Sequence, residues 1–334
     1  MLELTRRLTA AFGVSGFEDE IRAVIRDAVA PLVDHVRTDV LGNLIAFRRG
    51  SGGGKVIMLA AHMDQIGLII THVDEKGFLR FAPVGGVYAL ASWGNLVRFA
   101  DGTVGTVGLD GRTSRGEAVP ALREMYVDVG ATDRAQVKVR VGDVAVFDGA
   151  FTAQGTAWFA PNMDDRIGCA ALVQLLQELK GQPITHDLYA VFTTQEEVGP
   201  RGAATSAYAI APDVALALDV TLTGDTPRPA QAMDVALGRG VAIKIQDSGM
   251  ISHAGLTRQL IATAEAAGIP YQLEVLVGGT TDAERIQVAR GGVPASALSI
   301  PSRHVHTAAQ IVDRRDVAAT VALLRAWVGK AIEW

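Results

Sequence analysis

The sequence contains little cysteine, no long apolar run and no excess of basic residues. Cys169 is the only cysteine among the 334 residues, so an internal disulfide is impossible and a reducing compartment such as the cytoplasm is expected. No apolar run approaches the roughly 18 residues that a membrane-spanning helix needs. The 31 Lys and Arg residues are fewer than the 36 Asp and Glu residues, and the net charge of -5 argues against nucleic acid as the main partner.

Charged residues are also few, and apolar residues are many. Charged residues make up 20% of the chain and apolar residues 49%, which predicts a substantial packed core rather than disorder. The mean hydropathy of +0.24 is high for a protein without a membrane span. An apolar surface buried between subunits would account for this excess, so we expect a homo-oligomer that binds neither membranes nor nucleic acid.

The order of apolar patterns along the chain predicts an α/β fold. Residues 55–61 form an apolar run without alternation, which is typical of a strand buried on both faces. From about residue 69 to residue 152, short alternating segments such as 136–139 are separated by turns and indicate a small β-barrel. After residue 159, strands alternate with helices. We predict a mostly parallel central sheet flanked by helices, formed by residues 1–68 and 153–334, with an inserted β-barrel domain of residues 69–152.

The first 30 residues carry two helix signals. Leu4 and Leu8 have helical spacing, which predicts a packed N-terminal helix rather than an export signal. Ser15 followed by Glu18 forms a capping-box pattern, which predicts that a second helix begins near residue 18 and ends near residue 30.

His62 ends the apolar run 55–61, and Asp64 follows two residues later. Open α/β sheets bind ligands beyond the ends of their strands, which makes His62 a candidate ligand. Asp64 could hold its second ring nitrogen and so fix the tautomer. Taken alone, a core histidine paired with an acid explains these two residues equally well.

Asp164, Asp165 and Arg166 stand where a helix over residues 164–179 is expected to begin. One acid would suffice to cap the helix, and the second costs repulsion unless a cation offsets it. Asp164 could bridge two cations through its two oxygens, and Arg166 could orient it. Helix capping alone remains the alternative.

Further acids and histidines follow later strands. Glu196 and Glu197 come after the apolar strand 187–194, and Asp219 ends the strand 213–219. Carboxylates at the ends of buried strands are unfavourable unless a partner offsets their charge. His304 and His306 lie two residues apart in a predicted loop. We choose His306 as the ligand, although the spacing does not decide between the two histidines.

Together these residues predict a site for two metal ions. Mixed sets of imidazoles and carboxylates suit Zn²⁺ best, and Co²⁺ or Mn²⁺ as alternatives. Two such ions can activate a water molecule and bind a carbonyl oxygen. Glu196, next to a ligand, could move the proton of that water as general base and then acid. The predicted ligands are His62, Asp164, Glu197, Asp219 and His306.

Six short motifs occur in the order found in the tetrahedral, or deblocking, aminopeptidases, a family that includes glutamyl aminopeptidases. The chain resembles this family over nearly its whole length, in the motifs GVSGFE (13–18), DVLGNL (39–44), AHMDQIG (61–67), DDRIG (164–168), QEEVG (195–199) and GGTTDA (278–283). It departs from the family at His304, where Tyr is usual, and in the stretch 109–114. The ordered set is specific, whereas no single motif would be.

The resemblance implies a role for each matched residue. His62, Asp164 and Asp219 would hold one ion, Glu197 and His306 would hold the other, and Asp164 would bridge the two. Glu196 would be the catalytic base, and Asp64 would support His62. The inserted β-barrel would mediate dimerisation, and dimers of the family assemble into hollow shells of twelve subunits.

We therefore expect an aminopeptidase that releases N-terminal residues from peptides by means of a water activated by two metal ions. One alternative is a related dimetal amidohydrolase that acts on acylated amino acids or peptides. Another is an endoglucanase-type glycoside hydrolase, in which two carboxylates would act without metal. A non-catalytic shell protein is a third alternative. The preferred N-terminal residue is not predicted, because it depends on loops that the sequence does not place.

Overall fold

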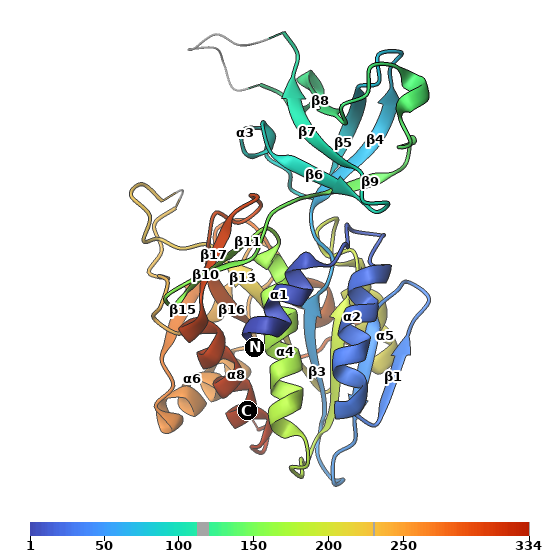
Figure 1. Ribbon diagram of the computed structural model, residues 1–334. Coiled ribbons are helices and arrows are strands. Elements are labelled where there is room, and N and C mark those ends of the chain that lie inside the picture. The colour runs from blue at the N-terminus through green and yellow to red at the C-terminus, as the bar shows by residue number, and fades with distance from the viewer. Residues whose placement is uncertain (112–119, 230, 334) are drawn as a thin grey trace.

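The computed structural model describes residues 1–111, 120–229 and 231–333, and forms a layered body with a small barrel above it (Figure 1). Residues 112–114 of the stretch that departs from the family pattern lie outside the described residues. Within the described part of the chain, no helix is long and apolar enough to cross a membrane.

Four parallel strands form the centre of the main sheet. β3 (Val56–His62) lies between β12 (Asp187–Thr193) and β13 (Val214–Thr221), and β13 also pairs with β16 (Ala295–Arg303). Side chains alternate between the two faces of β3: Ile57, Leu59 and Ala61 join one apolar cluster, whereas Met58 and Ala60 join another. The predicted apolar strand 55–61 is therefore buried on both faces, because an apolar cluster packs against each face.

The outer strands run antiparallel, so the sheet is only partly parallel. The hairpin of β1 (His35–Thr38) and β2 (Leu44–Arg48) extends it beyond β12. On the other side, β16 pairs antiparallel with β17 (Gln310–Asp313), which is followed by β11 (Ala157–Ala160) and β10 (Thr152–Gln154). β14 (Val241–Gln246) is antiparallel to β16 and parallel to β15 (Tyr271–Val275). The α/β class is confirmed, and the parallel arrangement holds for the centre.

Helices cover both faces of this sheet. One layer contains α1 (Leu2–Ala10), α2 (Asp19–Val29), α4 (Met163–Leu179), α6 (Ala254–Ala267) and α8 (Arg314–Val328), with α4 packed against β3 and β13 (Figure 1). The other layer contains α5 (Arg201–Ile210) and α7 (Ala283–Gln287), which contact each other. α5 was not predicted, because Gly199 and Pro200 indicate a turn and Pro200 in fact stands at the N-cap of the helix. A 3-10 turn, η1 (Ala30–Leu32), follows α2.

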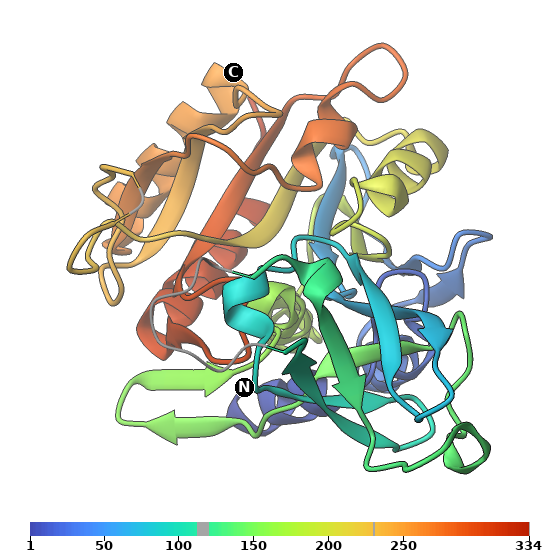
Figure 2. The same cartoon turned by 90° about the horizontal axis from the view of Figure 1, so that it is seen from above.

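Six antiparallel strands close into a barrel. They pair in the order β4-β5-β8-β7-β6-β9, around a separate apolar core that includes Leu68, Phe99 and Val107. Closure removes exposed strand edges. Figure 2 looks down onto this barrel. Its elements are β4 (Gly67–Val73), β5 (Leu79–Val84), α3 (Ala89–Ser92), β6 (Leu96–Phe99), β7 (Val104–Leu109), η2 (Leu122–Glu124), β8 (Met125–Asp128), η3 (Arg134–Gln136) and β9 (Val144–Phe147).

The prediction of a strand at 136–139 is wrong. The 3-10 turn η3 ends at Gln136, and no strand is assigned to residues 137–139. The carboxylate of Asp133 accepts the N–H of Ala135, and the Gln136 amide donates to the same side chain. These local hydrogen bonds stabilise a turn, and the pattern of apolar residues does not report them.

Candidate metal centre

The site lies where the parallel strands of the main sheet end. His62 is the last residue of β3, and Asp219 lies near the end of the adjacent parallel strand β13. Glu196 and Glu197 follow β12, after a turn in which Gln195 has a positive φ of 57°. His306, with a φ of 61°, lies in the loop between β16 and β17. Side chains from distant parts of the sequence thus meet at one edge of the sheet.

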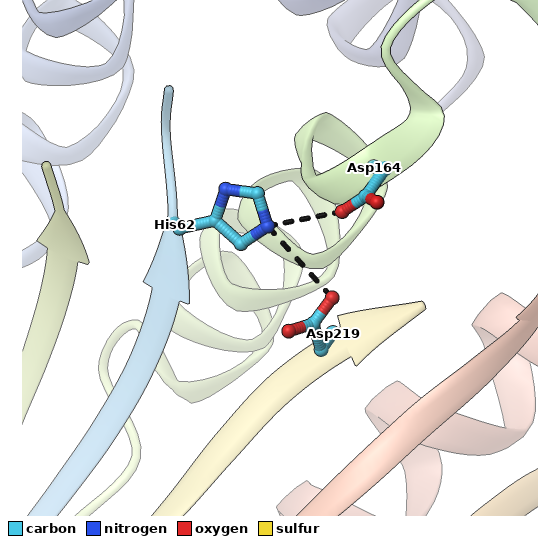
Figure 3. Close-up of side chains that lie close together, drawn as sticks. All are labelled: His62, Asp164 and Asp219. Atoms are coloured by element: carbon cyan, nitrogen blue, oxygen red, sulfur yellow. Dashed lines mark hydrogen bonds and ion pairs between the residues drawn. The ribbon is translucent and has the colours of Figure 1, made fainter. Parts of the chain in front are cut away.

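One group of candidate ligands contains His62, Asp164 and Asp219. The Nε2 atom of His62 lies 3.0 Å from Oδ1 of Asp164 and 3.8 Å from Oδ1 of Asp219 (Figure 3). All three residues are buried, and one ligand atom from each lies within 4.8 Å of the others. The three atoms could therefore surround one cation.

A second group contains Asp164, Glu197 and His306. The Nε2 atom of His306 lies 3.3 Å from Oδ2 of Asp164 and 3.2 Å from Oε2 of Glu197. Asp164 belongs to both groups, and each of its oxygens faces a different imidazole. The backbone of Asp164 has ψ 109° and is not helical, although it stands in the first turn of α4. Asp164 thus faces the centre rather than acting only as a helix cap.

The centre contains more acidic than basic side chains, so additional positive charge would stabilise it. Burial raises the pKa of Glu196 well above its ordinary value, and burial together with the charge of Asp164 raises the pKa of Glu197 and of Asp219. Burial alone would lower the pKa of His306, but its carboxylate neighbours raise it to about 12. Burial is thus the largest cause of the raised carboxylate pKa values, whereas Asp164 and Glu197 cause the raised pKa of His306.

Divalent cations fit this arrangement. The imidazole and carboxylate donors are those that Zn²⁺ and similar ions accept, and one shared carboxylate lies between the two groups. Two divalent ions would offset the negative charge that these buried carboxylates carry when ionised. The described residues therefore contain two candidate metal sites.

Asp64 contacts both His62 and the turn that carries Glu196 and Glu197. The Nδ1 atom of His62 lies 3.2 Å from the backbone oxygen of Asp64 and 3.5 Å from its carboxylate, so the contact with the second ring nitrogen is mainly to the backbone. The Asp64 carboxylate accepts the backbone N–H groups of Glu196 at 3.0 Å and Glu197 at 3.2 Å. Asp64 therefore holds the turn that carries both glutamates.

Two predictions near the site are wrong. Ser15 and Glu18 do not form a capping box: the Ser15 hydroxyl donates to the Asp64 carboxylate at 2.6 Å, and Glu18 accepts the backbone N–H of Gln195 at 3.2 Å. Arg166 does not orient Asp164. Its guanidinium donates to the backbone oxygens of Leu8, Ala11 and Gly13 and to the side chain of Gln65.

Sequence reasoning also missed a contribution from the barrel. The backbone oxygen of Gly86, in the loop between β5 and α3, lies 3.0 Å from Nδ1 of His306. The ring of Tyr88 lies 5.9 Å from the ring of His306. A Cβ atom at Gly86 would lie only 2.6 Å from His306 Nδ1, which explains a glycine there. His304 has a positive φ of 60° and is exposed, and neither group of candidate ligands includes it.

Comparisons with known proteins agree with this geometry. A family model described as M42 glutamyl aminopeptidase matches residues 42–323. An aminopeptidase from the archaeon Desulfurococcus kamchatkensis has a solved structure with a TM-score of 0.94 and 41% identity, covering 99% of this chain and 94% of that one. The lysyl aminopeptidase of Pyrococcus furiosus is 35% identical, covering 97% of this chain and 95% of its own.

A third relative is the TET1 peptidase of Pyrococcus horikoshii, described as assembling into a tetrahedron or a large octahedral shell. Its structure has a TM-score of 0.89 and 30% identity, covering 98% of this chain and 99% of that one. The match to a peptidase family supports the predicted hydrolysis of peptides. The chain therefore belongs to the M42 glutamyl aminopeptidase family and is an aminopeptidase, a peptide hydrolase.

Proposed function

We propose that this aminopeptidase uses two divalent metal ions, with Zn²⁺ the best fit and Co²⁺ or Mn²⁺ as alternatives. His62, Asp164 and Asp219 would hold one ion, and Asp164, Glu197 and His306 would hold the other. The observation that carries the proposal is the orientation of Asp164, because its two oxygens face His62 and His306 separately. When bound, the ions would act as Lewis acids toward water and the scissile carbonyl.

The protein's own groups would position the ligands and move the proton. The Oε2 atom of Glu196 lies 4.0 Å from His62 Nε2, so this carboxylate borders the first group. Glu196 would take a proton at a carboxylate oxygen from the attacking water and return it to the leaving amine. Burial favours the protonated form of Glu196, which is the form that the second step needs.

Two backbone oxygens would fix the tautomers of the histidine ligands. The Nδ1–H of His62 would donate to the backbone oxygen of Asp64, and the Nδ1–H of His306 to that of Gly86. Each Nε2 atom would then have a lone pair available to a metal ion. Asp64 would act as a positioning residue, through the N–H groups of Glu196 and Glu197 that it accepts.

The proposed proton transfer is tested by Glu196→Gln. This variant keeps the shape of the side chain but cannot take up a proton, so kcat on an aminoacyl-anilide should fall about 10²- to 10⁴-fold. Its metal content, measured by mass spectrometry of the dialysed protein, should equal that of the wild type. Glu178→Gln, at the opposite end of α4 from Asp164, is the control and should keep full activity. Substantial remaining activity in Glu196→Gln would refute the base assignment.

We also propose that residues 1–68 and 153–334 form the catalytic domain and that residues 69–152 mediate dimerisation. The barrel carries exposed apolar side chains on α3, β6 and β7, namely Leu90, Trp93, Leu96 and Val104. Such a patch favours burial in an interface. The shells described for the TET1 peptidase suggest that dimers of this chain could assemble further, into a tetrahedral dodecamer. The buried, free Cys169 agrees with a cytoplasmic location.

A further inference from the structure

A cleft of about 510 Å³ opens over the two candidate metal sites, and its charged lining residues all belong to the centre itself. These are Asp164, Glu196, Glu197, Asp219 and His306. Among the described residues, every other side chain that lines the cleft is neutral. The volume lies within the range of small-ligand sites. The side chain of a bound N-terminal residue must therefore contact the neutral part of the wall.

That wall is mainly apolar and comes from several segments. Tyr88 belongs to the barrel, Val220 and Leu222 lie at and after the end of β13, Leu276 and Val277 follow β15, and Val305 precedes His306. Leu222 is 37% exposed and Val277 is 81% exposed, so apolar surface remains available to a substrate. Burying an apolar side chain against this surface would be favourable.

Two cationic groups near the wall already have acidic partners. Lys244 lies behind Thr221, fully buried, with its Nζ atom 2.7 Å from Glu274 and 3.4 Å from Asp247. The hydroxyl of Thr221, which lines the cleft, donates to the same Glu274 oxygen at 2.7 Å. Lys244 therefore cannot neutralise an acidic substrate side chain without breaking a buried ion pair.

A second cation near the cleft is also paired. Arg303, next to the loop that carries His306, donates to both carboxylate oxygens of Asp225, at 3.0 Å and 2.5 Å. Among the described residues that line the cleft, no carboxylate outside the metal centre could bind a lysine side chain. Against the described residues of the wall, a charged substrate side chain would thus lose water and gain no oppositely charged partner outside the metal centre.

We propose that this enzyme prefers apolar N-terminal residues, such as leucine, methionine and phenylalanine, and discriminates against glutamate and lysine. The proposal rests on the proposed aminopeptidase mechanism and adds its substrate class. It separates this chain from the glutamyl activity in the description of its family and from its lysyl relative. Leu222 is a wall residue open to substitution, since it is exposed and belongs to neither metal group.

The test is a panel of aminoacyl-p-nitroanilides carrying Leu, Met, Phe, Glu and Lys, hydrolysed by the metal-loaded protein. The wild type should hydrolyse the leucyl substrate with a kcat/KM at least about 10-fold above the glutamyl and lysyl substrates. Leu222→Lys should raise the Glu/Leu ratio of kcat/KM about 10-fold, and Leu222→Glu should raise the Lys/Leu ratio similarly. Val40→Lys, at a fully exposed position of the β1–β2 turn, is the control and should leave both ratios unchanged.

The outcomes separate this inference from the proposed function. A wild type that releases glutamate or lysine faster than leucine would overturn the apolar preference while leaving the aminopeptidase mechanism intact. Unchanged ratios in both Leu222 variants would likewise overturn the assignment of this wall to the substrate side chain. If the metal-loaded protein hydrolyses no substrate of the panel, the proposed metal mechanism fails instead, and the inference falls with it.

Discussion

Asp164 connects the two halves of the candidate centre through a single carboxylate. Its Oδ1 faces His62 and its Oδ2 faces His306, whereas Asp219 and Glu197 each contact only one of these histidines. When a bridging carboxylate is removed, both ions lose a ligand. A ligand at one end loses only its own ion. The metal content of variants therefore distinguishes a shared ligand from an ordinary one.

We expect Asp164→Ala to retain close to no tightly bound metal and Asp219→Ala to retain about half the metal of the wild type. Metal content is measured after dialysis against a weak chelator. Ser248→Ala, an exposed position outside both groups, is the control. Equal metal content in the Asp164 and Asp219 variants would show that Asp164 does not serve both sites.

Asp316 gives a test of a buried acid away from the metal centre. Its carboxylate accepts the backbone N–H groups of Gly238 and Gly240, each at 2.7 Å, and burial raises its pKa to about 6. The unfolded state would ionise near pH 4. Between about pH 4 and pH 6 the folded state binds more protons, so the contribution of Asp316 to stability falls as pH rises.

We expect this pH dependence of the free energy of unfolding to disappear in Asp316→Asn. The free energy of unfolding of the wild type relative to this variant should decrease by up to about 3 kcal/mol between pH 4 and pH 7. Urea titrations at several pH values measure the difference, and titrations of other groups cancel between the two proteins. A difference that stays constant with pH, or that grows, contradicts the raised pKa.

The candidate ligands could be predicted from sequence because each follows an apolar strand or begins a helix. Their supporting residues could not. Ser15 and Glu18 match a capping box in sequence. Ser15 instead donates to Asp64, 49 residues away, and Glu18 accepts from Gln195, 177 residues away, as well as from its neighbour Gly16. The backbone oxygen of Gly86 has no sequence signature, since every residue has one. Local patterns predict local hydrogen bonds, and most of these contacts are not local.

At the scale of elements, α4 connects the N-terminal segment to the sheet. Arg166 lies in its first turns, fully buried, and donates to Leu8, Ala11 and Gly13 at or after the end of α1. A Cβ atom at Gly13 would lie 2.7 Å from this guanidinium, so the segment passes very close to it. One buried side chain therefore donates to several backbone oxygens of the N-terminal segment.

We expect Arg166→Met to lower the free energy of unfolding by roughly 2–5 kcal/mol, because it leaves buried carbonyl oxygens without donors. Urea unfolding followed by circular dichroism measures the loss. Arg325→Met on α8 is a matched control: that side chain is 59% exposed and its ion pair with Glu178 should contribute less than about 1 kcal/mol. Similar losses in both variants would show that the buried hydrogen bonds of Arg166 contribute little.

Helices and strands were predicted correctly where the apolar periodicity was strong. The prediction failed where local turns determine the structure. The central strands and the long helices α4, α6 and α8 follow from apolar runs and helical spacing. The antiparallel outer strands β10, β11 and β17 were missed, because they are short and their pairing brings together residues far apart in sequence. The strand direction in a sheet depends on such pairing, which explains why the sheet is less parallel than predicted.

At the scale of the whole molecule, the apolar patch of the barrel predicts how chains associate. Trp93 is 56% exposed and Leu90 is 71% exposed, and both lie at or beside α3. If this patch forms the proposed dimer interface, Trp93→Asp should yield monomers, because the variant would bury a charge without a partner there. Light scattering during size-exclusion chromatography measures the molar mass.

Val141→Asp is the control for this experiment, since Val141 is an exposed barrel residue outside the patch. It should leave the molar mass unchanged. If Trp93→Asp has the same molar mass as the wild type, the patch does not form the dimer interface. If both variants become monomers, the interface is not confined to α3, β6 and β7.

The hydrogen bond between His306 and the backbone of Gly86 has a practical consequence for anyone who wishes to shorten this enzyme. Excising the barrel would also remove the backbone oxygen that contacts an imidazole of the candidate metal centre. If His306 is the ligand proposed above, a truncated chain that still folded would be expected to have a misaligned histidine and little turnover.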